Sequence, residues 1–223
     1  MKKSSLTRPA LALALALGLS ACGGKASFPI TVTVFGLQYG NLVVGTNGQE
    51  LTFTPKANPT ADDIATGTFA KSIEYGEQYS VEPKKQPPHQ RCVPPGYDTA
   101  TDNSIKTWAD TAGHLATINV QYYCSVVAST IGGKISGLTA DGLVLINGTF
   151  GGGLVVAKDA TSFTMPQPVP YNQSYGVTVL TNPKGLICTV QNGTGVMGQG
   201  KDIDEAVTNI SVTCDPDPNA PPP

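Results

Sequence analysis

The feature that most constrains the fold is an internal repeat of about 95 residues, because two copies of one sequence pattern imply two copies of one small domain. Each copy passes in the same order through a Gly-Leu pair, an Asn-Gly turn, a Tyr-containing strand, a cysteine and a final strand that ends in a second cysteine. The matching segments are Gly36-Leu37 and Gly137-Leu138, Asn47-Gly48 and Asn147-Gly148, Phe69 and Phe163, 75–81 and 171–177, and 118–124 and 208–214. We therefore expect two tandem domains of similar architecture.

Short strands dominate the pattern within each copy. Residues 30–35 (ITVTVF) alternate apolar and polar side chains, as a half-buried strand does. The final strand of each copy likewise places its apolar residues on one face, together with its cysteine. The Asn-Gly turns and the 25 glycines and 18 prolines favour many tight hairpins. The sequence thus predicts an all-β sandwich or barrel in each copy, with one short helix at 104–112.

The start of the chain has the organisation of an export signal. Lys2, Lys3 and Arg8 come before an apolar run at 10–19. That run is too short to span a bilayer, which needs about 20 residues, but it has the length of a signal-peptide core. Export to an oxidising compartment is the expectation.

The apolar run ends in Leu19-Ser20-Ala21-Cys22, which resembles the lipobox of bacterial lipoproteins. The resemblance implies that residues 1–21 are removed and that Cys22 becomes the attachment site of a lipid anchor in the membrane. Gly23, where Asp would mark retention in the inner membrane, implies an outer-membrane location facing either the periplasm or the cell surface. The alternative is an ordinary secretory signal in which Cys22 is incidental.

Four cysteines remain after Cys22, and an even number in an exported chain favours disulfides. Four cysteines allow three pairings, and spacing alone does not choose among them. The repeat does choose, because it gives each copy one pair: Cys92 with Cys124, and Cys188 with Cys214. Metal binding is the alternative, but no CxxC pair is present and neither histidine is spaced with the cysteines as a ligand.

The second copy resembles a repeat found in tandem in proteobacterial surface proteins and lipoproteins that have no assigned function. The resemblance is carried by residues 188–195, of the form Cys-x-Val-x-Asn-Gly-x-Gly, and by 207–214, of the form Val-Thr-Asn-Ile-x-Val-x-Cys. The first copy departs from this pattern at 92–96, where Cys-Val-Pro-Pro-Gly replaces the strand and turn. The resemblance implies a small immunoglobulin-like β-sandwich for each copy and implies no chemistry.

These patterns divide the chain into five parts. Residues 1–21 are a signal peptide that is removed, 22–27 a lipidated tether, 28–125 the first sandwich, 129–214 the second sandwich, and 215–223 a disordered Pro-rich tail. The joint at 125–129 is short and apolar, so we expect a restrained, elongated pair of modules.

The charge pattern argues against nucleic acid as a partner. Acidic residues (16) outnumber basic ones (14) even before the three basic residues of the export signal are removed. The longest basic run is Lys84-Lys85, whereas binding to phosphate backbones needs a basic stripe.

No catalytic motif accompanies the two histidines, His89 and His114, and each is expected to be an exposed or locally bonded imidazole. Asp98, Asp102, Asn103 and Asp110 could offer oxygen ligands to Ca²⁺, but their spacing matches no calcium loop, so a solvated loop is favoured. Trp108, the only tryptophan, is interpreted as a core residue, with an exposed contact residue as the alternative.

The sequence therefore favours a cell-envelope lipoprotein that acts as a non-enzymatic binding or structural module, without cofactor or metal. One alternative is a carbohydrate- or calcium-dependent adhesion module that uses the 94–112 loop. Another is a hydrolase with a site that motifs do not reveal. The expected partners are the membrane, through the lipid, and an envelope protein or a glycan.

Overall fold

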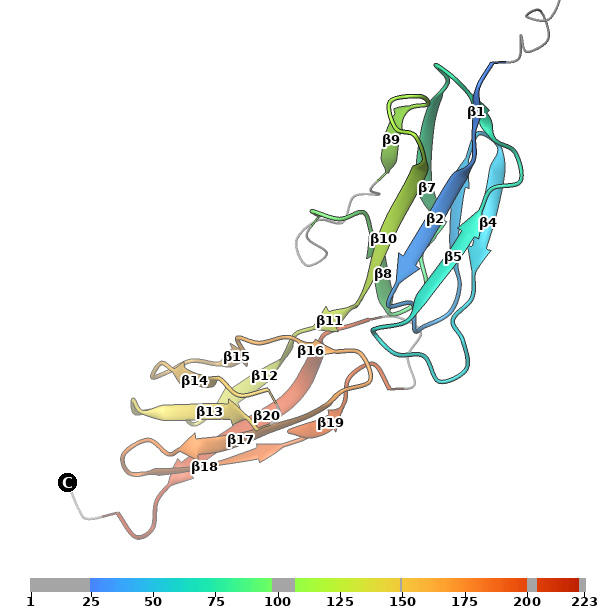
Figure 1. Cartoon of the computed structure of the whole chain (residues 1–223). Coiled ribbons are helices and arrows are strands. Elements are labelled where there is room, and N and C mark those ends of the chain that lie inside the picture. Colours follow the sequence, from blue (N-terminus) through green and yellow to red (C-terminus); the bar gives the residue numbers. More distant parts are fainter. Residues whose placement is uncertain (1–24, 98–106, 149, 200–203, 221–223) are drawn as a thin grey trace, which may run out of the picture.

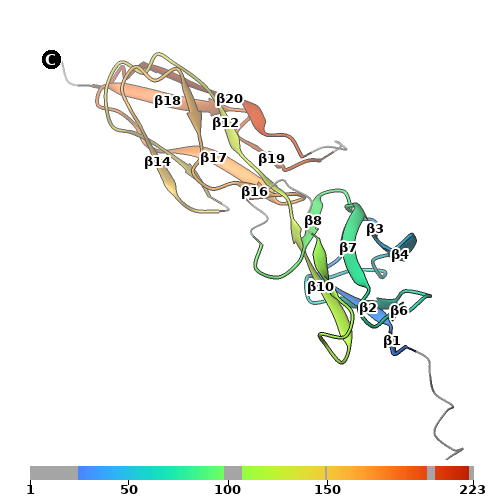
Figure 2. The same cartoon turned by 90° about the horizontal axis from the view of Figure 1, so that it is seen from above.

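A computed structural model describes residues 25–97, 107–148, 150–199 and 204–220 of the 223-residue chain. Every regular element in these ranges is a β-strand, and the strands form two sandwiches that meet at one end (Figures 1 and 2). No helix among the described residues is long and apolar enough to cross a membrane.

The first sandwich is built from ten strands. They are β1 (Ser27–Phe28), β2 (Ile30–Phe35), β3 (Leu42–Thr46), β4 (Gln49–Phe53), β5 (Ile64–Thr68), β6 (Ile73–Glu74), β7 (Gln78–Lys85), β8 (Gln90–Val93), β9 (Trp108–Thr111) and β10 (Ile118–Val126). Two four-stranded sheets, in the orders β5-β2-β10-β8 and β4-β3-β7-β9, pack face to face. β2 and β10 run parallel, and all other pairs are antiparallel.

The second sandwich repeats this plan. Its strands are β11 (Ala128–Ser129), β12 (Ile131–Ser136), β13 (Leu143–Asn147), β14 (Gly153–Val156), β15 (Ser162–Thr164), β16 (Val169–Pro170), β17 (Ser174–Thr181), β18 (Leu186–Gln191), β19 (Thr194–Val196) and β20 (Val207–Pro216). The sheet orders are β15-β12-β20-β18 and β14-β13-β17-β19, and β12 and β20 are again the parallel pair. The prediction of two tandem immunoglobulin-like β-sandwiches is therefore confirmed.

Alternation along the strands fills both cores. Ile30, Val32 and Val34 are fully buried while the residues between them are only half-buried, as the period of two requires. Trp108 is also half-buried and packs against the first core, which agrees with its interpretation as a core residue.

Tyr122 connects the two sheets of the first sandwich. Its side chain is fully buried, and its hydroxyl donates a 2.8 Å hydrogen bond to the carbonyl of Val81. Burial, and secondarily the nearby Glu82 carboxylate, raises the pKa of Tyr122 well above its ordinary value.

We predict that Tyr122 destabilises the fold in alkali. The pKa of Tyr122 is higher in the folded than in the unfolded protein, where it is about 10. The neutral phenol therefore contributes its full stabilisation below pH of about 10, and this contribution is lost as the pH rises further. Phenolate absorbance should show this one tyrosine titrating only as the protein unfolds. The Tyr122→Phe variant should cost about 1 kcal/mol near neutral pH and show a shallower alkaline loss. Identical alkaline profiles for the two proteins would contradict the prediction.

Each disulfide joins neighbouring strands within one sheet. Cys92 on β8 lies directly opposite Cys124 on β10, and Cys188 on β18 lies opposite Cys214 on β20. This is the one-pair-per-repeat arrangement that the repeat predicts. It differs from antibody domains, in which the disulfide links the two sheets. Here the bridge attaches an edge strand to the last strand of its repeat.

Three expectations need correction. The predicted helix at 104–112 is wrong where the structure describes it, because Trp108–Thr111 pairs with β7 as strand β9. The tail predicted from Asp215 begins later: Asp215 and Pro216 still pair with β18, and the N–H of Asp217 bonds to the carbonyl of Gly185. Finally, Phe69 and Phe163 are not equivalent, since Phe163 lies opposite Gly133 whereas Phe69 bonds through its N–H to Ile30.

Candidate functional site on the first sandwich

An apolar row crosses the outer face of the β5-β2-β10-β8 sheet. Phe35 on β2 is flanked by Ile64 on β5 and by Tyr123 on β10. The rings of Phe35 and Tyr123 stack, with centroids 4.6 Å apart and planes 8° from parallel. Ile64 is 64% exposed and Tyr123 42% exposed, although their outward neighbours on β2, on β5 and at the start of β10 are threonines and amides. Large apolar side chains that gather on a solvent-facing sheet indicate a contact surface.

A groove lies beside Tyr123, on the side away from Phe35. We call it the tyrosine groove; it has a volume of about 360 Å³ and is lined by Val93, Pro94, Pro95, Gly96, Tyr97, Tyr123 and Ser125. Tyr97 and Pro95 are exposed, whereas Val93 and Pro94 form a buried floor. None of the described residues that line the groove is acidic or basic.

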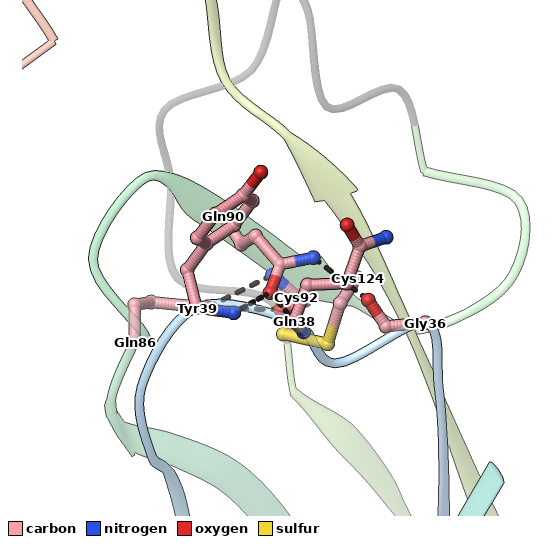
Figure 3. Close-up of a disulfide and its surroundings, with 7 residues drawn as sticks. All are labelled: Gly36, Gln38, Tyr39, Gln86, Gln90, Cys92 and Cys124. Atoms are coloured by element: carbon pink, nitrogen blue, oxygen red, sulfur yellow. Dashed lines mark hydrogen bonds between the residues drawn. A yellow bond between two sulfur atoms is a disulfide. The ribbon is translucent and has the colours of Figure 1, made fainter. Parts of the chain in front are cut away.

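Two glutamines, the buried Gln90 and the half-buried Gln86, bind the backbone around the Cys92–Cys124 bridge (Figure 3). Gln90 accepts hydrogen bonds through Oε1 from the N–H groups of Gln38 and Tyr39, at 2.6 and 2.8 Å, and donates through Nε2 to the carbonyl of Gly36 at 2.7 Å. Gln86 exchanges two 2.9 Å hydrogen bonds with the backbone of Cys92. Together with the Cys92–Cys124 bridge, these bonds fix the end of β2 against β8, on which Phe35 and Val93 stand.

The second sandwich carries hydroxyl groups where the first carries Phe35 and Tyr123. Gly137 follows Ser136 as Gly36 follows Phe35, and Thr213 precedes Cys214 as Tyr123 precedes Cys124. Ser136 lies opposite Thr213, and Thr213 lies opposite Thr189, which takes the place of Val93. The Ser136 and Thr213 hydroxyls are 3.4 Å apart. The fold therefore does not need an apolar row at this position.

The joint between the sandwiches is packed with aromatic side chains. The His89 ring stacks on Tyr171 of the second sandwich, with centroids 3.6 Å apart and planes 1° from parallel. Tyr39 meets the Tyr171 ring edge-on at 5.1 Å. His89 Nδ1 also lies 2.7 Å from Oδ1 of Asp204, and the two side chains are only 11% and 20% exposed. Contacts from both sandwiches thus converge on His89.

Backbone hydrogen bonds reinforce the joint. The N–H of Val127 donates to the carbonyl of His89, and the N–H of Tyr171 donates to the carbonyl of Val127, both at 2.9 Å. His89 precedes β8 in a turn, and its backbone has a φ of 59°, which lies in the left-handed region. The expectation of an exposed or locally bonded imidazole is therefore wrong for His89, whose partners lie far along the chain.

We predict that His89→Asn loosens the joint. Asparagine tolerates the left-handed backbone but removes the ring that stacks on Tyr171. Small-angle scattering and donor–acceptor distances between the sandwiches should show a broader distribution of separations, with the unfolding free energy changed by less than about 1 kcal/mol. His114→Asn is the matched control, because the His114 side chain is 67% exposed on the first sandwich. An unchanged distance distribution for His89→Asn would refute the prediction.

The other residues singled out in the sequence do not form a site among the described residues. Asp98, Asp102, Asn103 and the lipid-attachment residue Cys22 lie outside the described ranges. Asp110 accepts hydrogen bonds from the N–H of Thr111 at 2.7 Å and from His114 at 2.9 Å, which lower the pKa of its carboxyl group. Within the described ranges, no three His, Cys, Asp or Glu side chains are grouped as metal ligands.

Comparison with known proteins adds no established activity. The chain matches no protein family and no curated protein sequence. Among solved structures, it is similar to the Bacillus anthracis TIE protein (12% identity, TM-score 0.41), covering 83% of this chain and 34% of that one. It is also similar to the Streptococcus pyogenes major pilins T3.2 (10% identity, TM-score 0.33; 86% and 98% covered) and T-13 (14% identity, TM-score 0.30; 87% and 98% covered). The chain thus spans about a third of the TIE protein.

Proposed function

We propose that the chain is a lipid-anchored protein of the cell envelope that acts by non-covalent binding, with the apolar row and the tyrosine groove of the first sandwich as its contact surface. The observation that carries the proposal is the contrast between the sandwiches. Phe35, Tyr123 and Val93 in the first are replaced by Ser136, Thr213 and Thr189 in the second, on the same strands of the same fold. A feature that the fold does not require points to a role in recognition.

The proposed location is supported by the N-terminal sequence and by the disulfides. The segment 19–22 has the form of a lipobox, and two acyl chains on Cys22 would anchor the protein stably. The two bridges need an oxidising compartment to form and persist. Mass spectrometry of the mature N-terminus tests the anchor: an acylated Cys22 is expected, and an unmodified chain in the soluble fraction would contradict it.

Photo-crosslinking in intact cells tests the contact surface. A benzophenone amino acid replaces Tyr123 in one strain and Thr213 in another, so that the two probes occupy equivalent positions of the two sandwiches. We expect discrete adducts from position 123 and none above background from position 213. The membrane fraction and melting curve of each variant establish that it is exported and folded.

The two probes separate the possible outcomes. Adducts from position 123 alone support recognition by the first sandwich, and their masses identify the partner as protein or glycan. Equal adducts from both positions, or none from either, would contradict the proposed contact surface, whatever the outcome for the lipid anchor.

A further inference from the structure

We infer that the tyrosine groove binds the proline-rich segment 216–223 of a second copy of this chain, so that copies join head to tail. The inference rests on the proposed contact surface and names its partner. Three features carry it: the chemistry of the groove, the composition of the segment, and the distance between the two within one molecule.

The groove has the chemistry that recognises polyproline. Proline-rich segments bind between aromatic side chains, which pack against the flat pyrrolidine rings. Tyr97 and Tyr123 line the groove, and Pro94 and Val93 give it an apolar floor. The exposed Ser125 hydroxyl and the Tyr123 hydroxyl, which lies 3.5 Å from Gln121 Oε1, can donate to the carbonyls of a polyproline backbone, which has no internal hydrogen bonds.

The segment 216–223 reads PDPNAPPP. Prolines restrict the backbone before binding, so such a segment loses little conformational entropy when it docks. Pro216, Pro218 and Asn219 are exposed, and beyond Asp217 the described chain makes only local turn contacts, from Asn219 and Ala220 back to Asp217. Pro218 and Asn219 are thus presented to solvent just beyond the end of β20.

Within one molecule the segment cannot reach the groove. β20 begins at the joint, where the N–H of Val207 bonds to the carbonyl of Thr130, and its ten residues advance about 30 Å away from it. Residues 217–223 extend by at most about 25 Å. The groove lies beyond the joint on the first sandwich, beside Tyr123 and Ser125 of β10. Binding therefore requires a second copy.

Each copy offers one groove and one segment. The second sandwich has no equivalent groove wall, because Thr213 stands where Tyr123 does. A groove that binds a different surface of its partner makes a heterologous contact, which generates open chains unless rotation closes a ring. Anchored copies would thereby be linked along the membrane.

The test uses the mature chain, residues 22–223, with Cys22→Ser so that no lipid is attached. Sedimentation velocity over a concentration series measures self-association, and fluorescence anisotropy measures binding of a labelled peptide with the sequence 215–223. Tyr123→Thr, which introduces the residue of the second sandwich, should weaken both by at least tenfold, a loss of about 1.4 kcal/mol. Tyr75→Thr is the control, because Tyr75 is 64% exposed outside the groove.

A second variant changes the ligand and leaves the groove intact. Pro218→Ala, Pro221→Ala, Pro222→Ala and Pro223→Ala together should abolish self-association, while this chain still binds the native peptide. A full chain that remains monomeric and ignores the peptide would overturn the inference, as would peptide binding that survives Tyr123→Thr. If Tyr123→Thr instead abolishes only binding to a glycan panel, the tail is excluded as the ligand and the proposed contact surface stands.

Discussion

Replacing Gly133 by alanine should unfold the second sandwich while the first stays folded. A Cβ atom on Gly133 would lie 1.8 Å from the carbonyl oxygen of Ile210 and 2.5 Å from its carbonyl carbon. Both are backbone atoms of the neighbouring strand β20, so no side chain can rotate away. The alternative is to separate β12 from β20, which would break the parallel pair at the centre of the sheet.

The size of the effect follows from the marginal stability of small domains. A clash that forces the backbone apart belongs among the severe substitutions, and we expect a loss of at least about 4 kcal/mol. That is comparable to the whole stability of many domains of this size. In the first sandwich the equivalent position is Val32, which is fully buried and pairs regularly with Val120. The difference arises from the register shift between Ile131 and Gly133, which brings Ile210 close.

Urea unfolding can assign the loss to one sandwich. Trp108 is the only tryptophan, so its fluorescence reports on the first sandwich, whereas circular dichroism reports on both. For Gly133→Ala the fluorescence transition should stay in place while part of the dichroism signal is lost. Gly176→Ala is the control, because nothing lies within 4 Å of the added atom, and it should change stability by less than about 1 kcal/mol. A Gly133→Ala protein as stable as the control would show that the clash is absent.

The repeat made most of the fold predictable. Matching strands and turns predicted two copies of one sandwich, and the strand phase placed Cys188 and Cys214 on inward faces, where the structure has them buried. Prediction failed where register depends on tertiary contacts. Phe163 looks like the counterpart of Phe69, but its structural equivalent is Gly67, against which the ring of Phe53 packs. The two cores thus fill similar space from different strands.

The sequence contains a signal for the contact surface, although the motif search did not find it. Phe35 and Tyr123 stand at the outward phase of their strands, where ITVTVF and INVQYYC otherwise carry polar residues, and a large aromatic residue in that phase is a signal for recognition. The joint carries no such signal. The contacts of His89 with Tyr171 and Asp204 depend on how the two sandwiches dock, and the residues concerned are far apart in the chain.

Removing the Cys188–Cys214 bridge by Cys188→Ala with Cys214→Ala should destabilise the second sandwich by about 3.5 kcal/mol, the chain-entropy value for a closed loop of this length. The two cysteines are separated by 26 positions, and both side chains lie in the core, so loss of the two sulfur atoms adds a packing cost. The paired strands β18 and β20 keep six registered residue pairs without the bridge, so the fold should weaken without changing its topology.

The matched experiment removes the other bridge, by Cys92→Ala with Cys124→Ala. Its separation of 32 positions predicts a similar loss of about 3.7 kcal/mol, but in the first sandwich. The Trp108 fluorescence transition should therefore shift to lower urea for this variant and stay unchanged for the Cys188 and Cys214 variant. If either variant moved the fluorescence and dichroism transitions equally, the two sandwiches would be coupled through the joint and would unfold together. In that case His89→Asn should separate the two transitions. If neither variant lost stability, the bridges would be dispensable for folding.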